Sequence, residues 1–345
     1  MKFLIDSNKT IFDALVEIDK ISAESQTLFV IDDLCRLQGS LSDGDIRRFL
    51  ITGGSIYDKV SSAMYCNCAF LFEGDEELVA KLRQLRDNKK TLVPICDKEL
   101  HVIDIINLEK LKSSLPVDAV LMAGGKGERL RPLTQTMPKP LVKVGNKAII
   151  DYNVERLISY GVKDINVTIN YLGEQLEEHF SNPINGVKVG CVREPQYLGT
   201  IGSIQFVKEF HNDTILVMNS DLFTNIDYED FYLHFKEHNA DMSVAAVPYD
   251  VSVPFGIFEL DGRNITGINE KPTYHYYANA GIYLFKKDML KYVPENKFFN
   301  ATDFIEELVK QRMRVVRFPI TGYWIDIGQY SELEKATELV KHITL

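Results

Sequence analysis

Short apolar runs alternate with longer helix-like stretches along the chain from residue 117 onward. The apolar runs are nearly continuous, which is typical of strands buried on both faces of a sheet. They predict strands at 118–123, 164–170, 187–193, 214–220 and 242–249. The stretches that separate the runs predict helices near 149–160, 172–180, 200–210 and 228–239. Such alternation predicts an α/β fold with a mainly parallel, doubly wound, Rossmann-like sheet.

A second pattern occurs twice near the start of the chain. A helix-like stretch at 10–20 is followed by an apolar run at 27–33, and one at 75–88 is followed by a run at 91–97. Both runs end in an acid and precede a second short strand, with an offset of 64 residues. Two helix–strand–strand units predict a smaller α/β domain with internal pseudo-twofold symmetry.

A polar stretch at 112–114, followed by Pro116, predicts a linker between the two patterns. We therefore expect two domains, at 1–113 and 117–345.

The overall charge narrows the classes of partner. The chain of 345 residues has a formal net charge of −10, which argues against a broad nucleic-acid or anionic-membrane surface. No apolar run is long enough for a membrane helix, and the start does not resemble a secretory signal, so we expect a cytoplasmic protein. The five cysteines are then expected to be reduced thiols.

A glycine-rich loop, Gly124-Gly125-Lys126-Gly127, follows the first strand of the second domain. Ligands of parallel α/β sheets collect at the carboxyl ends of strands, and glycines let backbone N–H groups approach phosphates closely. Lys126, Arg129, Arg131 and Lys139 follow over a proline-containing loop. The spacing fits neither a Walker A loop nor a dinucleotide fingerprint, but it predicts a local site for an anion.

The full string from residue 124 to 140, G-G-x-G-x-R-L-x-P-L-T-x-x-x-P-K-P, resembles the signature of the sugar-1-phosphate nucleotidyltransferases. Further islands occur in that family's order over about 225 residues. They are Glu194-Pro195 with 198–202, Asn219-Ser220-Asp221, Glu270-Lys271-Pro272, 279–283 and 324–328.

The resemblance implies a role for each of these positions. The nucleotide would contact Ala123, Gly124, Gly125, Gly127, Leu198, Gly199 and Thr200. The sugar would contact Glu194, Gly202, Glu270, Asn279 and Gly281. The catalytic cations would be Arg129 and Lys139 on the β- and γ-phosphates and Lys271 on the sugar phosphate, and Asp221 and Asp326 would hold Mg²⁺.

The family's reaction joins a nucleoside triphosphate to a sugar 1-phosphate and releases pyrophosphate. A sugar phosphate is already ionised at neutral pH, so positioning and charge stabilisation carry the rate. The chain is closest in appearance to the mannose-1-phosphate guanylyltransferase branch, which favours GTP over dTTP, UTP or CTP. Hexose or hexosamine phosphates for bacterial surface glycans are the expected sugars. Tyr274, His275, Tyr276 and Tyr277 either shape the sugar pocket or form an aromatic loop over core residues.

Within the first domain, the stretch from Gly39 to Arg48 resembles a cystathionine-β-synthase (CBS) motif. In that family, the positions of Ser42 and Asp45 contact an adenine nucleotide. The second unit, at 101–107, lacks the glycine and has Asn107 at the position of Asp45. The domain therefore serves either packing and dimerisation or nucleotide sensing, and we expect a homodimer.

Two other functions are weighed against the transferase. A catalytically idle, nucleotide-sensing regulator would be expected to lose the phosphate and metal residues, whereas Arg129, Lys139, Asp221, Lys271 and Asp326 are all present. His234-Phe-Lys-Glu-His238 fits the H-x-x-E-H pattern of a zinc peptidase, but its flanks predict an amphipathic helix and no third ligand is obvious nearby.

Overall fold

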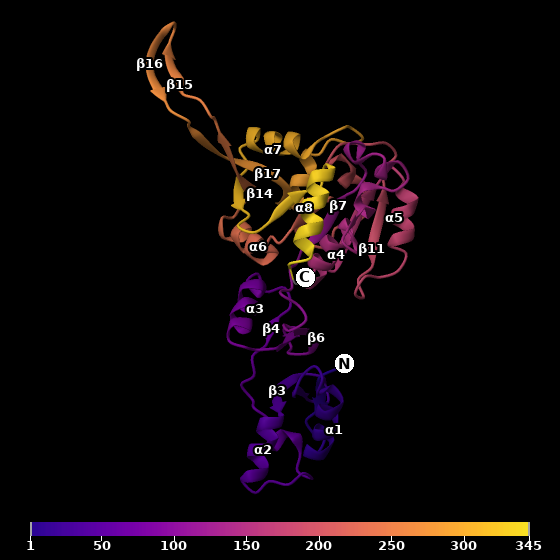
Figure 1. Ribbon diagram of the computed structural model, residues 1–345. Helices are drawn as coiled ribbons and strands as arrows, with labels where there is room; N and C mark the ends of the chain where they lie inside the picture. The colour runs from indigo at the N-terminus through magenta and orange to yellow at the C-terminus, as the bar shows by residue number, and fades with distance from the viewer. Residues whose placement is uncertain (1, 344–345) are drawn as a thin grey trace. The chain divides into compact units, whose positions relative to one another are not determined.

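The computed structural model describes residues 2–343 and divides the chain into two compact units, Met1–Ser114 and Leu115–Leu345 (Figure 1). The division falls in the polar stretch that predicted a linker. Each unit has its own sheets and its own hydrophobic clusters, and each is described by itself below. None of the helices within residues 2–343 is both long enough and apolar enough to span a bilayer.

The first unit contains two three-stranded sheets of the same design, with strand orders β1-β2-β3 and β4-β5-β6. In each sheet the first two strands are parallel and the last two form an antiparallel hairpin. The elements are β1 (Leu4–Asp6), α1 (Ile11–Ile21), β2 (Thr27–Ile31), β3 (Leu37–Ser42), α2 (Asp43–Ile51), β4 (Leu71–Phe72), α3 (Leu78–Asp87), β5 (Leu92–Cys96) and β6 (Val102–Asn107).

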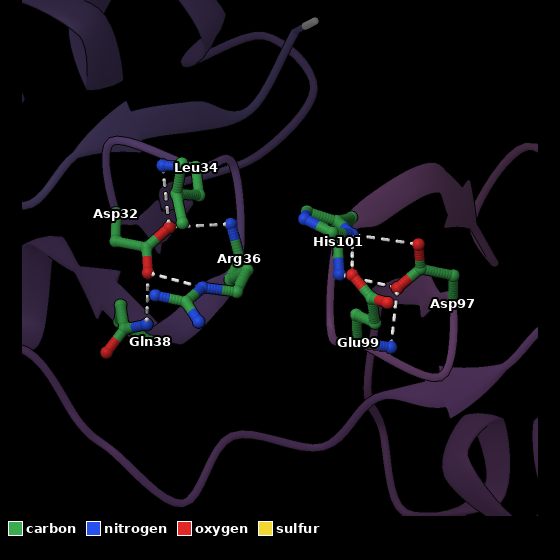
Figure 2. A network of polar contacts seen from close by, with 7 residues as sticks. All are labelled: Asp32, Leu34, Arg36, Gln38, Asp97, Glu99 and His101. Atoms are coloured by element: carbon green, nitrogen blue, oxygen red, sulfur yellow. Dashed lines mark hydrogen bonds and ion pairs between the residues drawn. The ribbon is translucent and has the colours of Figure 1, made fainter.

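The two hairpin turns of this unit are built in the same way, as Figure 2 shows. Asp32 opens one turn and Asp97 the other. Each carboxylate accepts hydrogen bonds from the backbone N–H groups two and four residues further along, at 2.9–3.0 Å. Each also contacts a side chain four residues ahead, Arg36 or His101. Such aspartate-capped turns are a local solution that the sequence itself encodes.

The same turns pair with one another across a pseudo-twofold axis. The Leu37 N–H donates to the Leu100 carbonyl at 2.9 Å, and the Val102 N–H donates to the Cys35 carbonyl at 3.2 Å. Both contacts repeat with an offset of 65 residues, so the predicted offset of 64 was wrong by one. The apolar pattern aligned Asp33 with Asp97, whereas the turn geometry aligns Asp32 with Asp97.

The second unit is built on a seven-stranded sheet with the order β11-β10-β7-β12-β17-β14-β18. The β17 strand is antiparallel to both of its neighbours, and the other pairs are parallel. The mostly parallel α/β fold is therefore confirmed. The sheet strands are β7 (Asp118–Met122), β10 (Asp164–Ile169), β11 (Val189–Arg193), β12 (Thr214–Asn219), β14 (Met242–Ser252), β17 (Thr273–Lys286) and β18 (Val315–Pro319).

Helices and short ribbons complete this unit. The helices are α4 (Ile149–Ser159), α5 (Gly173–His179), α6 (Tyr228–Glu237), α7 (Ala301–Lys310) and α8 (Tyr330–Val340). The short strands are β8 (Lys143–Val144), β9 (Lys147–Ala148), β13 (Leu222–Thr224), β15 (Ile257–Asp261), β16 (Asn264–Asn269) and β19 (Trp324–Asp326).

The helix predicted near 200–210 was wrong, because only a 3-10 turn forms there, at Gly202–Phe206. The N–H groups of Ile201 and Gly202 donate to the carbonyl of Phe299, at 3.2 and 3.1 Å. The turn ends at Val207, whose backbone is extended (φ −65°, ψ 119°), and the Gly202 carbonyl accepts a hydrogen bond from the Gln205 side chain at 2.6 Å.

The β14 and β17 strands are longer than the sheet that contains them. Their pairing continues outward to Ser252 and Thr273, and the chain between them forms the β15–β16 hairpin, which projects from the body of this unit (Figure 1). We call residues 248–277 the arm. Residues 274–277 lie in β17 and are exposed, so they do not form a loop over the core.

Candidate active site

A cavity of about 420 Å³ lies at the carboxyl ends of four neighbouring parallel strands, β7, β10, β11 and β12. Each strand supplies a lining residue within one position of its end: Ala123, Thr168, Glu194 and Asn219. This is the edge at which parallel α/β sheets bind ligands. The remaining lining residues are Met122, Gly124, Gly125, Gly127, Glu128, Arg129, Lys139, Pro140, Tyr197, Gly199, Thr200, Ser203, Ser220, Asp221 and Gly328.

The glycine loop is held by close contacts that leave no room for a side chain. Gly127 has φ 61°, and a Cβ there would lie 2.9 Å from the Cβ of Lys139. The Thr134 hydroxyl donates to the Gly127 carbonyl at 2.8 Å and fixes the turn. A Cβ at Gly124 would clash with Oε1 of Glu194. Glycine is therefore required at 127 by the backbone and its packing, whereas a side chain at 124 would displace the Glu194 carboxylate.

Glu194 is a buried carboxylate, only 3% exposed, behind this loop. Its Oε2 accepts a hydrogen bond from the Leu198 N–H at 3.2 Å. Burial raises the pKa of Glu194 from 4.5 to about 7, against the smaller opposing effect of that hydrogen bond. A ligand in the cavity therefore meets a carboxyl group that changes charge near neutral pH.

Replacing Glu194 with glutamine is expected to raise the melting temperature at pH 8 and to leave it unchanged at pH 4. The folded protein keeps a proton on Glu194 up to about pH 7 that the unfolded chain releases near 4.5. The free energy of unfolding therefore falls as the pH rises through this window, and a neutral amide removes the fall. Thermal melts of both proteins from pH 4 to pH 8 measure this.

The matched control is Glu209→Gln, which removes the same charge from a side chain that is 75% exposed. It is expected to follow the wild type at every pH. An equal or lower melting temperature for Glu194→Gln at pH 8 would contradict the assignment of the raised pKa.

Asp221 follows the end of β12 and forms an ion pair with Lys139 of the glycine-loop segment, 82 residues away in sequence. The buried side chain of Asn153 holds the turn that carries Asp221. Its amide donates to the carbonyls of Ser220 at 3.3 Å and Leu222 at 2.9 Å. The Ser220 hydroxyl donates to the Met122 carbonyl at 2.8 Å and ties β12 to β7. Three elements thus position one carboxylate.

Asp326 is brought beside Asp221 by strand pairing. The β13–β19 ladder places Asp326 opposite Leu222, and the Trp324 indole N–H anchors β19 by donating to the Ala280 carbonyl at 2.8 Å. Desolvation and then the charge of Asp221 raise the pKa of Asp326. Asp326 does not line the cavity directly.

This carboxylate pair has the donor chemistry of a divalent-cation site. The two carboxylates repel each other when both are ionised, and a bound cation offsets this repulsion. Within residues 2–343 there is no group of three His, Cys, Asp or Glu side chains arranged around one metal position. A Mg²⁺ bound here would therefore complete its coordination with substrate phosphates and water, as Mg²⁺ commonly does. The rings of His234 on α6 and of His238, the residue after the end of α6, stack with their centroids 4.1 Å apart.

Arg129 lies at the mouth of the cavity and is exposed. A Cβ on Gly328 would lie 2.9 Å from Nη2 of Arg129, so Gly328 leaves the space that the guanidinium occupies. Arg131, two residues further along, is paired with Glu128 at 3.4 Å and is not among the described residues that line the cavity.

Sequence reasoning did not assign several of the lining residues. Thr168 reaches the cavity because β10 pairs with β7 in register, Thr168 opposite Met122. Ser203 is buried under the site and Tyr197 is exposed at its mouth. Tyr197 lies between two motifs that were recognised, whereas nothing in the local sequence of Thr168 or Ser203 signals a site.

Two residues expected to bind ligand pack beneath the cavity. The Leu198 side chain is 1% exposed, and the backbone N–H of Leu198 donates a hydrogen bond to the Glu194 carboxylate. A Cβ at Gly202 would lie 3.0 Å from the Leu198 Cβ and from the Lys297 carbonyl. Both residues shape the loop that presents Gly199 and Thr200.

Four residues expected to serve catalysis or the sugar lie off the cavity. Glu270 and Lys271 are exposed on the arm. The Asn279 side chain is engaged locally, accepting from the Gly281 N–H and donating to the Tyr283 hydroxyl, both at 2.9 Å. Gly281 is buried with φ 71°, and a Cβ there would lie 2.6 Å from the Asn219 amide nitrogen. Gly281 thus supports a lining residue from behind.

The first unit has a separate cavity of about 600 Å³. Ser42 and Asp45 both line it, together with Arg48, Lys89 and Lys90. The Ser42–Asp45 pair also has a structural role, because the two side chains form a capping box at the start of α2. In the second half of the repeat, Asn107 ends β6 and its side chain caps a turn, accepting from the Glu109 N–H at 2.9 Å.

The sequence pattern of the nucleotidyl transferase family matches residues 118–342, which is the whole seven-stranded unit up to α8. The chain belongs to this family. The cavity at the ends of β7, β10, β11 and β12 lies within the matched residues. The first unit lies outside the matched residues.

Several curated proteins resemble part of the chain. A mannose-1-phosphate guanylyltransferase catalytic subunit beta from Danio rerio is 29% identical over 61% of this chain and 61% of its own length. A mannose-1-phosphate guanyltransferase from Yarrowia lipolytica is 31% identical over 63% of this chain and 62% of its own. The bifunctional protein GlmU of Methanocaldococcus jannaschii is 30% identical over 64% and 54%. The match thus spans about three fifths of these relatives.

Solved structures also resemble the fold. HddC from Yersinia pseudotuberculosis is 28% identical, with a TM-score of 0.52, and covers 65% of this chain and 99% of its own. The same protein complexed with GMP-PN is 25% identical, with a TM-score of 0.51 and the same coverage.

Proposed function

We propose that this protein transfers a nucleotidyl group from GTP to a sugar 1-phosphate, releasing pyrophosphate. The observation that carries the proposal is the Lys139–Asp221 pair, which joins the glycine-loop segment to the end of β12 inside the cavity. A cation and a carboxylate held together beside a glycine-rich loop suit a reaction that brings two polyanions into contact.

The residues of the cavity have different roles in this reaction. Backbone N–H groups at Gly124, Gly125 and Gly127 approach the triphosphate, and Arg129 and Lys139 neutralise its outer phosphates. A sugar-phosphate oxygen then attacks the α-phosphorus. A new P–O bond forms, the bond between the α-phosphorus and the β-bridging oxygen breaks, and pyrophosphate leaves with the electron pair. Lys139 is the side chain able to move from Asp221 to a departing phosphate oxygen.

Asp221 and Asp326 would hold Mg²⁺. The ion supplies charge neutralisation between the two reacting phosphates. The protein's own contribution is the placement of the two carboxylates, one by the turn after β12 and one by the β13–β19 ladder.

The choice of GTP is supported by the relatives. Several are named guanylyltransferases, and HddC has been crystallised with a guanine nucleotide analogue. Base selection rests on a few hydrogen bonds, and the cavity lining offers buried polar groups, Thr168, Ser203 and Ser220, that could make them.

The test is pyrophosphate release by the full chain with Mg²⁺. GTP, dTTP, UTP, CTP and ATP are each offered with mannose-, glucose-, glucosamine- and N-acetylglucosamine-1-phosphate. Turnover is expected with GTP. Turnover with another base would reassign the donor, and no turnover with any pair would favour the idle, regulatory alternative.

As a second function, we propose that the cavity of the first unit binds an adenine nucleotide in the manner of a CBS pair. Three cations, Arg48, Lys89 and Lys90, line one cavity with the hydroxyl of Ser42 and the carboxylate of Asp45. This arrangement suits a nucleotide, because the cations can bind its phosphates and the carboxylate can accept hydrogen bonds from the ribose hydroxyls.

Calorimetric titration of the full chain with ATP and with AMP tests this second function. Binding is expected, and Lys90→Glu is expected to weaken it by about tenfold or more because a charge-assisted contact becomes repulsive. Lys98→Glu is the control, since Lys98 is exposed on the same unit and does not line the cavity. Absence of heat with wild-type protein and both nucleotides would contradict the proposal.

A further inference from the structure

Three buried hydroxyl groups line the cavity among residues 2–343, and one of them has no hydrogen-bond partner there. Thr168, Ser203 and Ser220 are 1, 1 and 3% exposed. The Ser220 hydroxyl donates to the Met122 carbonyl at 2.8 Å, and the Thr168 hydroxyl donates to the Met122 sulfur at 3.7 Å. The Ser203 hydroxyl is bonded to no other group of the described chain. Ser203 is therefore the buried hydroxyl that remains available to a ligand.

A hydroxyl in such a position discriminates between ligands. It offers one donor and two acceptor lone pairs, and it rotates to suit the group that it meets. A ligand that covers Ser203 separates the hydroxyl from water, so the ligand either bonds the hydroxyl or leaves it unsatisfied and binds more weakly. Sites that contain buried polar groups reject analogues that lack the matching group. Ser203 thus has the properties of a residue that determines specificity.

The residues before Ser203 are held to a distant segment at Phe299. The Phe299 N–H donates to the Leu198 carbonyl at 2.9 Å. The Phe299 carbonyl accepts from the N–H groups of Ile201 and Gly202, at 3.2 and 3.1 Å. The backbone that leads to Ser203 is therefore fixed, and rotation of the hydroxyl is the main freedom that remains. A fixed group discriminates more sharply than a mobile one, because it does not move away from a mismatched ligand.

The cations of the cavity lie toward one end of the glycine loop. Arg129 and Lys139 are the only Lys or Arg side chains among the described residues that line the cavity. Gly127 lies against Lys139, whereas Gly124, at the start of the loop, lies against the carboxylate of Glu194. A triphosphate bound along the loop is expected to place its outer phosphates at the cations. Its nucleoside then points toward Gly124 and Glu194.

Ser203 belongs to the segment of the wall that starts at Glu194. The Leu198 N–H ties this segment to the Glu194 carboxylate at 3.2 Å. Between Glu194 and Ser203 the sequence has no charged side chain, and the segment also supplies Thr200 to the cavity. A neutral wall suits a nucleoside better than a phosphate, because the base and the ribose offer uncharged hydrogen-bonding groups.

We propose that Ser203 selects the nucleotide by a hydrogen bond between its hydroxyl and an uncharged group of the nucleoside, on the edge of the base or on the ribose. Both sources offer the same chemistry, a neutral donor or acceptor, and the experiments below distinguish them. The inference rests on the proposed function for the presence of a nucleoside triphosphate in the cavity. It does not depend on the identity of the sugar.

Ser203→Ala tests the proposal because it removes the hydroxyl and leaves the backbone unchanged. No group of the described chain loses a hydrogen-bond partner, so the melting temperature of the free protein is expected to stay within about 2 °C of wild type. Calorimetric titration of the full chain with GTP and Mg²⁺ is expected to show about 5- to 20-fold weaker binding. The KM for the sugar 1-phosphate is expected to change by less than about twofold.

The matched control is Ser243→Ala. Ser243 on β14 is fully buried and its hydroxyl also lacks a partner in the described chain, but it does not line the cavity. This variant is expected to bind GTP as the wild type does. Wild-type binding by Ser203→Ala, or a loss that falls on the sugar 1-phosphate instead of the nucleotide, would overturn the proposal.

Nucleotide analogues identify the group that Ser203 bonds. ITP lacks the 2-amino group of GTP, 7-deaza-GTP lacks N7, 2-aminopurine riboside triphosphate lacks O6, and dGTP and 3′-dGTP each lack one ribose hydroxyl. For the matching analogue, wild type is expected to lose about 5- to 20-fold in affinity and Ser203→Ala almost none, because the variant has already lost that interaction. Equal losses in both proteins for every analogue would overturn the proposal.

The binding measurements separate this inference from the proposed function, because they require no sugar phosphate and no turnover. If wild type binds nucleotide but releases no pyrophosphate with any substrate pair, the proposed function fails while the titrations still decide the role of Ser203. If wild type releases pyrophosphate and Ser203→Ala binds GTP equally well, the inference alone fails. A wild-type chain that binds no nucleotide would contradict both.

Discussion

Asp221→Asn is expected to lower the rate of pyrophosphate release by about 100- to 1,000-fold, with a smaller effect on the KM for nucleotide. The substitution removes the carboxylate charge next to Lys139 and Asp326 but keeps the size of the side chain. The loss falls on the rate because the charge at this position matters most when two phosphates are forced together and pyrophosphate departs. Initial rates at saturating substrate, over a range of Mg²⁺ concentrations, measure the effect.

The control for this substitution is Asp213→Asn. Asp213 is exposed at the opposite end of β12 from Asp221, so the same chemical change is made on the same strand away from the cavity. Wild-type rates are expected for it, and thermal melts should show that both variants are folded. A rate for Asp221→Asn within a few-fold of wild type would remove Asp221 from the proposed metal site.

Arg129→Ala is expected to lower kcat/KM for the nucleoside triphosphate by about 10- to 150-fold, since a hydrogen bond to a charged group contributes about 1.5–3 kcal/mol. The guanidinium lies over Gly328 at the mouth of the cavity, where a planar fork of donors can reach two phosphate oxygens. Arg129→Lys is expected to recover only part of the loss, because a single ammonium cannot reproduce bidentate contact.

Arg131→Ala separates this effect from a general change in charge. Arg131 belongs to the same loop, is exposed and pairs with Glu128, but it does not line the cavity. It is expected to retain kcat/KM within about twofold of wild type, as a surface ion pair contributes little. Equal losses for Arg129→Ala and Arg131→Ala would mean that the loop attracts nucleotide only through its overall charge.

The sequence by itself determined the fold class and most of the glycine-loop side of the cavity. Apolar periodicity is a local property, and it located four of the parallel strands to within two residues at most ends. The loop from Gly124 to Lys139 is also local, so its spacing indicated an anion site and its residues could be matched to the family signature. The pattern failed at 200–210, where the backbone turns extended at Val207 after a single 3-10 turn and the start of the segment is bonded to Phe299.

Only the tertiary structure decided which residues meet. Thr168 enters the cavity through the register of β10 with β7, and Asp326 reaches Asp221 through the β13–β19 ladder. Strand register joins residues far apart in sequence, and no local pattern encodes it. The same is true of the arm. The motif around Lys271 was legible in the sequence, but its exposure on an extended ribbon follows from the pairing of β14 and β17 beyond the edge of the sheet.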